Sequence, residues 1–510
     1  MTKFKMMPLV AMISAGLIGC GSSSSDGGSA PTPPKPTAPK YTWTIVELVR
    51  VTTPTAGCAT FYSYENELEP SNNYSVIARM ATQGYKILFH SADGSVLSEH
   101  TIEGDAISSG KVTIDSGKVP KDGYVSLEEY SGFNAGDRES YQIAFHAPLL
   151  QNMILTVRND QPSKNSCLTG DQVSKSLDAE QSRISVMTPN SGSVVYYQTS
   201  GSRLAVAGGK EQLDIPVVSD NPVKERKIVT SFLSSELDSY ERINSYLVVS
   251  ADKVYKAGSE PVSAGSMALV ENLFQVQLDE RFSFSNDKIS GLQVVLDNKI
   301  YNWQKIYAQA DNQTESGYAP QDSRLRNWSA NLSLVTDVNS GAWNYDVQLP
   351  LNGSDLSIEQ PSSLFDFSTS SLATSGITSL DGFTPTEWTV QRTHVRTVSN
   401  SNARPIIQTI YSVPNSNQPM VASSTEVIGD TSSAKISVSL AGSNEVDKLI
   451  LLNELMENSM DFETLSDPSQ IINSHKYDLN GAVVSESSSL TNRLKMAGKK
   501  AEFASNSVGW

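Results

Sequence analysis

Short runs in which apolar and polar residues alternate fill most of the chain after residue 40. Alternation with a period of two turns successive side chains to opposite faces of a strand, so each run predicts a half-buried β-strand. Asp93-Gly94 lies between two runs and is a strong signal for a hairpin turn. The spacing predicts an immunoglobulin-like β-sandwich over 41–185, whose runs lie at 42–51, 74–80, 85–90, 96–102, 111–114, 124–128, 141–145 and 153–157.

Two further groups of alternating runs predict two more β-domains. The second domain is expected over 186–320 and the third over 321–510, with the polar stretch 311–326 as a linker between them. The fold class is therefore mainly β, a string of β-sandwich-like domains. The runs of the second group include 184–187, 194–199, 228–233, 267–278 and 292–296, and those of the third include 330–336, 343–351, 388–398, 406–413 and 435–440.

One segment near the end of the chain has the period of a helix instead. Val446, Leu449, Ile450 and Leu455 fall on one stripe, and they predict a helix over 445–458 with Ser443 or Asn444 as its cap. The alternative is a further long strand. The last twenty residues are polar and are expected to be loosely ordered.

The first forty residues differ from the rest of the chain. Lys3 and Lys5 precede a short apolar run, 9–18. The motif Leu17-Ile18-Gly19-Cys20 overlaps the end of this run. The run is too short to cross a bilayer as a permanent helix, so it predicts an export signal. A Ser/Gly stretch and then five prolines follow. Such segments are flexible or extended, so they predict a tether: Pro31, Pro33, Pro34, Pro36 and Pro39.

Leu17-Ile18-Gly19-Cys20 resembles the lipobox of bacterial lipoproteins. The resemblance implies a signal peptide over 1–19, cleavage before Cys20, diacylglycerol and N-acyl chains such as palmitate on that cysteine, and a tether over 20–40. In this family Asp after the cysteine favours the inner membrane, and Gly21 stands there instead, which implies the outer membrane. The alternative is an ordinary cleaved signal. The segment 20–28 and the β-rich mature chain also resemble large lipoproteins of flagellar sheaths in marine Gram-negative bacteria.

Charge and cysteine content narrow the possible partners and the compartment. The formal net charge of -16 argues against a nucleic-acid partner and against binding to anionic lipid surfaces. The chain has three cysteines. With Cys20 carrying lipid, Cys58 and Cys167 remain, and an oxidising compartment allows them to form a disulfide. The alternative is a pair of buried free thiols.

Motifs that would indicate catalysis or a resident metal are scarce. The five histidines have no zinc-ligand spacing, and only His90 and His100 are close enough across a predicted hairpin for a metal pair, with unrelated strand histidines as the preferred interpretation. No Gly-x-Ser-x-Gly nucleophile motif occurs. Residues 337–341 begin like a calcium loop but fail at later ligand positions, so a hairpin turn is preferred. Two acidic pairs stay open as carboxylates for a hydrolase: Glu128-Glu129 and Asp279-Glu280.

These observations favour a lipid-anchored outer-membrane or surface lipoprotein with a structural or binding, non-catalytic role, such as a flagellar sheath component or an adhesin. Its expected partners are the outer membrane, through the lipid on Cys20, and a protein or glycan; no cofactor other than that lipid is expected. The alternatives are a polysaccharide or peptide hydrolase with its catalytic domain in 190–510, and a periplasm-facing envelope-assembly lipoprotein.

Overall fold

The computed structural model describes residues from 37 to 506, with gaps. The predicted signal peptide, Cys20 and most of the tether lie outside the described residues, and so does the loop at 337–342. The described ranges are 37–52, 56–64, 74–104, 109–131, 139–157, 167–170, 182–187, 196–199, 202–205, 212–216, 228–237, 240–256, 258–270, 272–285, 288, 290–306, 313–336, 343–361, 364, 370–400, 404–429, 431–432, 434–459 and 486–506.

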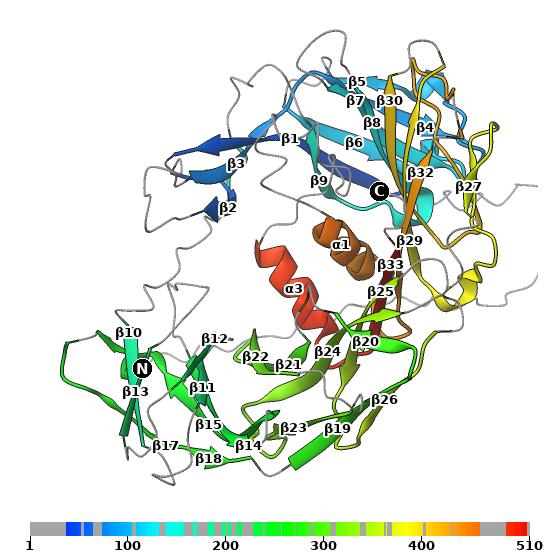
Figure 1. Ribbon diagram of the computed structural model, residues 1–510. Helices are drawn as coiled ribbons and strands as arrows, with labels where there is room; N and C mark the ends of the chain where they lie inside the picture. The colour runs from blue at the N-terminus through cyan, green and yellow to red at the C-terminus, as the bar shows by residue number, and fades with distance from the viewer. Residues whose placement is uncertain are drawn as a thin grey trace, which may run out of the picture. The chain divides into compact units, whose positions relative to one another are not determined.

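The protein is mainly β, as its alternating pattern predicts, and its largest sheet has 13 strands. The order is β22-β21-β24-β25-β33-β32-β29-β30-β8-β7-β4-β5, with β20 paired to β24 (Figure 1). The strands span Tyr85–His90 (β4), Ile102–Glu103 (β5), Tyr124–Ser131 (β7), Glu139–His146 (β8), Phe282–Phe284 (β20), Gly291–Leu296 (β21), Lys299–Lys305 (β22), Arg326–Thr336 (β24), Trp343–Pro350 (β25), Val390–Val398 (β29), Pro405–Ser412 (β30), Lys435–Gly442 (β32) and Ala501–Asn506 (β33).

This sheet takes strands from all three of the segments that the sequence predicts as separate domains. β8 pairs in parallel with β30, from Ser140 opposite Ile406 to Phe145 opposite Tyr411 (Figure 1). The rings of Phe145 and Tyr411 stack with centroids 5.4 Å apart. Backbone pairing therefore continues across both predicted boundaries, 185/186 and 320/321, and the chain from Pro39 onward forms one compact unit.

A second sheet faces part of the large one and completes a sandwich in the N-terminal segment. Its order is β2-β3-β1-β6, and β9 pairs in parallel with β1. Trp43 on β1 is fully buried and meets Phe145 edge to face, with ring centroids 5.6 Å apart. The alternating side chains of the two sheets thus share one apolar core. The strands are Lys40–Val51 (β1), Thr60–Tyr64 (β2), Tyr74–Met80 (β3), Lys111–Asp115 (β6) and Met153–Val157 (β9).

The described residues also form four smaller sheets, in the orders β13-β10-β16 with β17 beside β10, β12-β11-β14-β15-β18, β23-β19-β26 and β27-β28-β31. An aromatic core joins some of these strands to the large sheet, since the rings of Tyr246 on β15 and Trp303 on β22 have centroids 5.3 Å apart. The strands are Ser182–Met187 (β10), Tyr196–Thr199 (β11), Ser202–Ala205 (β12), Gln212–Pro216 (β13), Ile228–Leu237 (β14), Tyr240–Ser250 (β15), Tyr255–Lys256 (β16), Ser263–Ser266 (β17), Ala268–Leu269 (β18), Asn272–Leu278 (β19), Gln313–Tyr318 (β23), Leu356–Ile358 (β26), Ser371–Leu372 (β27), Ile377–Ser379 (β28) and Asn417–Pro419 (β31).

Two local predictions need correction. The expected strand 96–102 is a short 3-10 helix, Ser98–His100, followed by the two-residue β5. The expected linker 311–326 contains β23, whose Tyr318 is buried against Phe274 of β19. Its sequence, Gln-Thr-Glu-Ser-Gly-Tyr, contains one large apolar residue, Tyr318, which packs into an aromatic core built from distant residues, so the polar pattern did not predict a strand.

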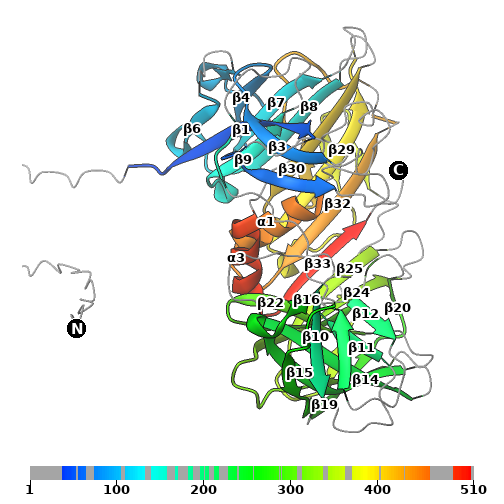
Figure 2. The same ribbon diagram turned by 90° about the vertical axis from the view of Figure 1, so that its left-hand side faces the viewer.

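The predicted C-terminal helix is confirmed as α1, Lys448–Ser459. Asp447 accepts a hydrogen bond from the Leu449 amide at 2.8 Å and begins the helix, while Ser443 caps the turn before it. The expectation of a loose C-terminus is wrong. A second helix, α3, spans Glu486–Met496, and β33 then enters the large sheet between β25 and β32 (Figure 2).

Candidate functional site

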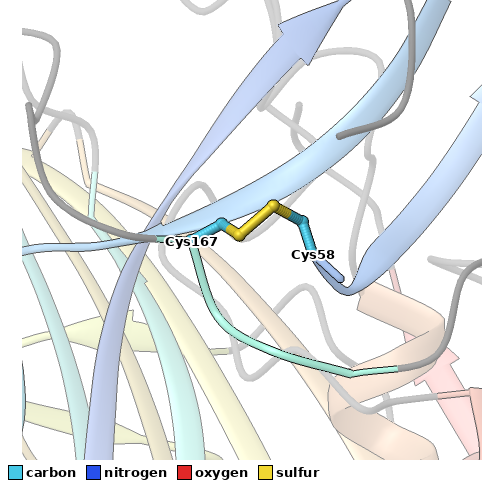
Figure 3. The surroundings of a disulfide bond; sticks show 2 residues. All are labelled: Cys58 and Cys167. Atoms are coloured by element: carbon cyan, nitrogen blue, oxygen red, sulfur yellow. A yellow bond between two sulfur atoms is a disulfide. The ribbon is translucent and has the colours of Figure 1, made fainter. Parts of the chain in front are cut away.

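The predicted disulfide is present in the structure. Cys58 and Cys167 are bonded with their Cα atoms 5.5 Å apart, across a sequence separation of 109 residues (Figure 3). Backbone pairing holds the same segment in place, because the Ala59 amide donates to the Leu168 carbonyl at 2.7 Å and the Leu168 amide donates to the Ala78 carbonyl at 2.8 Å. The bond therefore joins the segment after β9 to the edge of the sheet formed by β1, β2 and β3.

The two histidines of the predicted hairpin do not form a metal pair. The ring nitrogens of His90 lie 3.1 Å from the Gly94 carbonyl and 2.8 Å from the Ser126 hydroxyl, so both are engaged inside the protein. Burial lowers the pKa of His90 to about 4. His100 instead contacts the edge of the Phe89 ring. Among the described residues, no group of three His, Cys, Asp or Glu side chains is arranged to hold a metal ion.

Neither acidic pair presents two carboxylates to one cleft. Glu128 is buried and accepts hydrogen bonds from the backbone amide of Ser424. Its neighbour Glu129 points to the opposite face of β7, because side chains alternate along a strand. Asp279 is held by the guanidinium of Arg281 at 2.8 and 2.9 Å, which lowers its pKa to about 2, and the adjacent Glu280 is exposed.

A cavity of about 260 Å³ lies between the two helices and the large sheet. Both views show α1 and α3 side by side next to β33 (Figures 1 and 2). Strands β21, β22, β24, β25 and β33 form its floor, and Glu454 of α1 and Arg493 of α3 lie on the opposite side. It is a polar cavity lined entirely by described residues, so we take it as the candidate functional site.

The floor of the cavity is polar because of how β24 and β25 alternate. Trp328, Ala330, Leu332 and Leu334 of β24 are buried in the aromatic core. The residues between them turn to the other face, where two of them, Asn331 and Ser333, are half-buried. On β25 the apolar side chains enter the same core, while two polar ones face the helices. The polar lining residues of these strands and of β21 are Gln293, Asn327, Ser329, Asn331, Ser333, Asp346 and Gln348.

Glu454 is the unusual member of the lining. Its side chain is only 7% exposed, and its Oε1 atom has no hydrogen-bond partner among the described residues. Burial raises the pKa of its carboxyl to about 7, and the nearby carboxylate of Glu457 adds to the rise, whereas Arg493 opposes it. Arg493 donates to Glu457 at 3.0 Å, and Ser489 donates to the same carboxylate at 2.7 Å. Arg493, the cationic residue of the lining, is therefore already paired with Glu457 and not with Glu454.

The remaining polar groups divide into those that hold the structure and those that are free to bind. The amide of Gln348 donates to the carbonyls of Met496 and Lys499 at 2.7 and 3.1 Å, which fixes the end of α3 on the sheet. Asp346 is paired with Lys288 at 2.5 Å. The Asn331 amide makes no side-chain hydrogen bond to any other described residue. The cavity thus offers Asn331 and Glu454 as unused donors and acceptors.

The sequence pattern does not predict this cavity, although two local signals point to its lining. The alternation Asn327-Trp-Ser-Ala-Asn331 is regular, which predicts a strand with one polar and one apolar face. Glu454 lies among Leu451, Leu452 and Leu455, all buried, so it interrupts the apolar side of a helix. Each signal concerns a single element, β24 or α1, whereas the cavity forms only where the two elements come together.

Comparisons with known proteins add no relative. No protein-family model matches the chain, and no curated protein matches its sequence. In the described part of the chain, no helix is long and apolar enough to cross a membrane.

Proposed function

We propose that this protein is a lipid-anchored lipoprotein of the outer membrane with a structural or binding role. The observation that carries the proposal is the sequence Leu17-Ile18-Gly19-Cys20 after a basic start and a short apolar run. Attachment through several acyl chains is stable, whereas a single chain binds membranes only marginally. The anchor on Cys20 would be followed by the Ser/Gly and Pro-rich tether.

The disulfide and the length of the tether support this proposal. The disulfide between Cys58 and Cys167 suits an oxidising compartment outside the cytoplasm. The compact unit begins at Pro39, so the preceding tether has about 20 residues and reaches at most roughly 60 Å when extended. A folded body on such a tether can meet partners at some distance from the membrane to which it is attached.

Fractionation of intact cells tests where the protein acts. We expect the full chain in the outer-membrane fraction, and external protease should degrade it if it faces the surface. Enrichment in isolated flagella would favour a sheath component, and uniform exposure over the cell body would favour an adhesin. Recovery of the chain in the soluble periplasmic fraction would contradict the proposal.

A further inference from the structure

We propose that the cavity between α1, α3 and the large sheet binds one neutral sugar residue of a glycan. The inference goes beyond the lipid anchor and stands independently of it, because it rests only on the lining of the cavity. Glu454 supplies the first observation, since its side chain lines the cavity and its buried Oε1 atom has no hydrogen-bond partner among the described residues, a costly state for a buried polar group.

The lining matches hydroxyl groups, which both donate and accept hydrogen bonds. Asn331 has an amide that does the same, and so does the hydroxyl of Ser333, whereas the Ser329 hydroxyl already accepts a hydrogen bond from the Gly498 amide at 2.9 Å. The carboxyl of Glu454 is protonated below about pH 7 and then also donates as well as accepts. The groups of the lining that are not already engaged can thus act in either direction, which suits a polyol better than a ligand with one fixed polarity.

The charges of the site favour a neutral ligand. Arg493 is paired with Glu457 at 3.0 Å, and Asp346 is paired with Lys288 at 2.5 Å. Neither a free cation for an anionic ligand nor a free carboxylate for a cation stands in the lining below about pH 7. Binding a charged ligand would require one of these pairs to break, and that would remove part of the energy gained.

The size and the apolar part of the lining fit a single ring. Ligand pockets for drug-sized molecules measure about 300–1,000 Å³, so the cavity of about 260 Å³ suits a smaller molecule. The half-buried ring of Phe503 and the side chain of Met496 also line it. Such an aromatic surface packs against the C–H face of a sugar ring, while the hydroxyls at the ring edge reach the polar floor.

The test is ligand binding by the full chain, purified in a detergent without a sugar headgroup. Saturation-transfer NMR is recorded with glucose, galactose, mannose, N-acetylglucosamine, N-acetylgalactosamine and rhamnose, and with putrescine as a cationic probe. We expect at least one neutral sugar to bind at millimolar concentration or below. Asn331→Leu should weaken that binding by roughly tenfold or more, because it replaces a hydrogen-bonding side chain of the lining by an apolar one of similar size.

Matched variants separate the cavity from the rest of the sheet. Asn344 lies on β25 and faces the same side as Asp346, but it is exposed and lies outside the cavity. Asn344→Leu should therefore bind the sugar as the unchanged chain does, and thermal unfolding confirms that each variant is folded. Glu454→Gln, which keeps a donor and an acceptor, should retain binding within roughly threefold.

Three results would overturn the inference. They are the absence of saturation transfer to every sugar, equal binding by the Asn331→Leu and unchanged chains, and preferential binding of putrescine. Absence of transfer would mean that the cavity holds only water. Equal binding by the variant would mean that the sugar binds elsewhere, and preferential binding of putrescine would mean that the cavity binds a cation.

Discussion

Glu454 places an ionisable carboxyl where its charged form is costly. Its pKa rises from 4.5 to about 7 in the folded protein, mainly because burial removes water. Between these two values the folded protein keeps the proton while the unfolded chain releases it. The free energy of unfolding therefore falls as pH rises from about 4.5 to about 7, and this contribution is constant above that range.

Replacing this carboxyl by an amide should stabilise the protein at high pH only. The rise of the pKa from 4.5 to about 7 corresponds to about 3 kcal/mol, so Glu454→Gln should raise the free energy of unfolding by about 2–3 kcal/mol at pH 8. At pH 4 the change should stay within about 0.5 kcal/mol. Urea unfolding at the two pH values measures both differences.

Glu457→Gln is the matched control for this prediction. Glu457 lies one turn away on α1, but its carboxylate is held by Arg493 and Ser489. This variant should gain no stability at pH 8, because it removes a paired charge and leaves Arg493 without its partner. An equal gain by Glu454→Gln at both pH values would show that the pKa of Glu454 is not raised in the folded protein.

The disulfide between Cys58 and Cys167 should contribute measurably to the free energy of unfolding. Its two cysteines are 109 positions apart, and closing a loop of this length stabilises a fold by about 4–5 kcal/mol on the chain-entropy model. The double variant Cys58→Ser/Cys167→Ser should lose up to that amount in denaturant unfolding. A reducing agent should destabilise the unchanged chain similarly and leave the double variant unaffected; a reductant effect of equal size on both would contradict the assignment.

The last strand, β33, is central to the large sheet although it contains few large apolar residues. It pairs with β25 on one side and β32 on the other, so it joins the two halves of the large sheet. Ala504 is 2% exposed and belongs to the aromatic core, whereas Ser505 is half-buried and faces the other side.

This position gives a sharp contrast between adjacent substitutions. Ala504→Asp should destabilise the protein by at least about 3 kcal/mol, because it buries an unpaired charge. Ser505→Asp should cost under about 1 kcal/mol, because its side chain retains access to water. Thermal unfolding and resistance to protease measure both changes. Similar losses in the two variants would mean that the register of β33 differs from the one described.

Periodicity predicted some elements and failed for others for physical reasons. Helix α1 was predictable because Val446, Leu449, Ile450 and Leu455 repeat with the period of a helix, although Leu451, Leu452 and Met456 turn out to be the most buried. α3 and β33 were missed because 486–506 contains few large apolar residues. β33 is buried through Ala501 and Ala504, small side chains whose burial depends on neighbours far away in sequence.

The whole molecule shows where sequence patterns stop being informative. Alternation predicts that a strand has a buried face, but it does not say which strand lies beside it. The parallel pairing of β8 with β30 joins Gln142 and Gln408, whose side chains hydrogen-bond at 2.8 Å across 266 positions. No local sequence pattern predicts this pairing. The three predicted domains were therefore not expected to share a sheet. The cavity likewise depends on contacts between elements that are far apart in sequence, such as β24 and α1.

The anchor is the central claim at this scale, and it rests on Cys20. The most direct test is the mass of the N-terminal peptide from the chain expressed in a Gram-negative host, together with labelling by a fatty acid. We predict a peptide that begins at Cys20 and carries diacyl and N-acyl groups. Cys20→Ser should lose the label and leave the membrane, while Cys58→Ser/Cys167→Ser should keep both. An unlabelled peptide, or a Cys20→Ser chain that stays membrane-bound, would contradict the account.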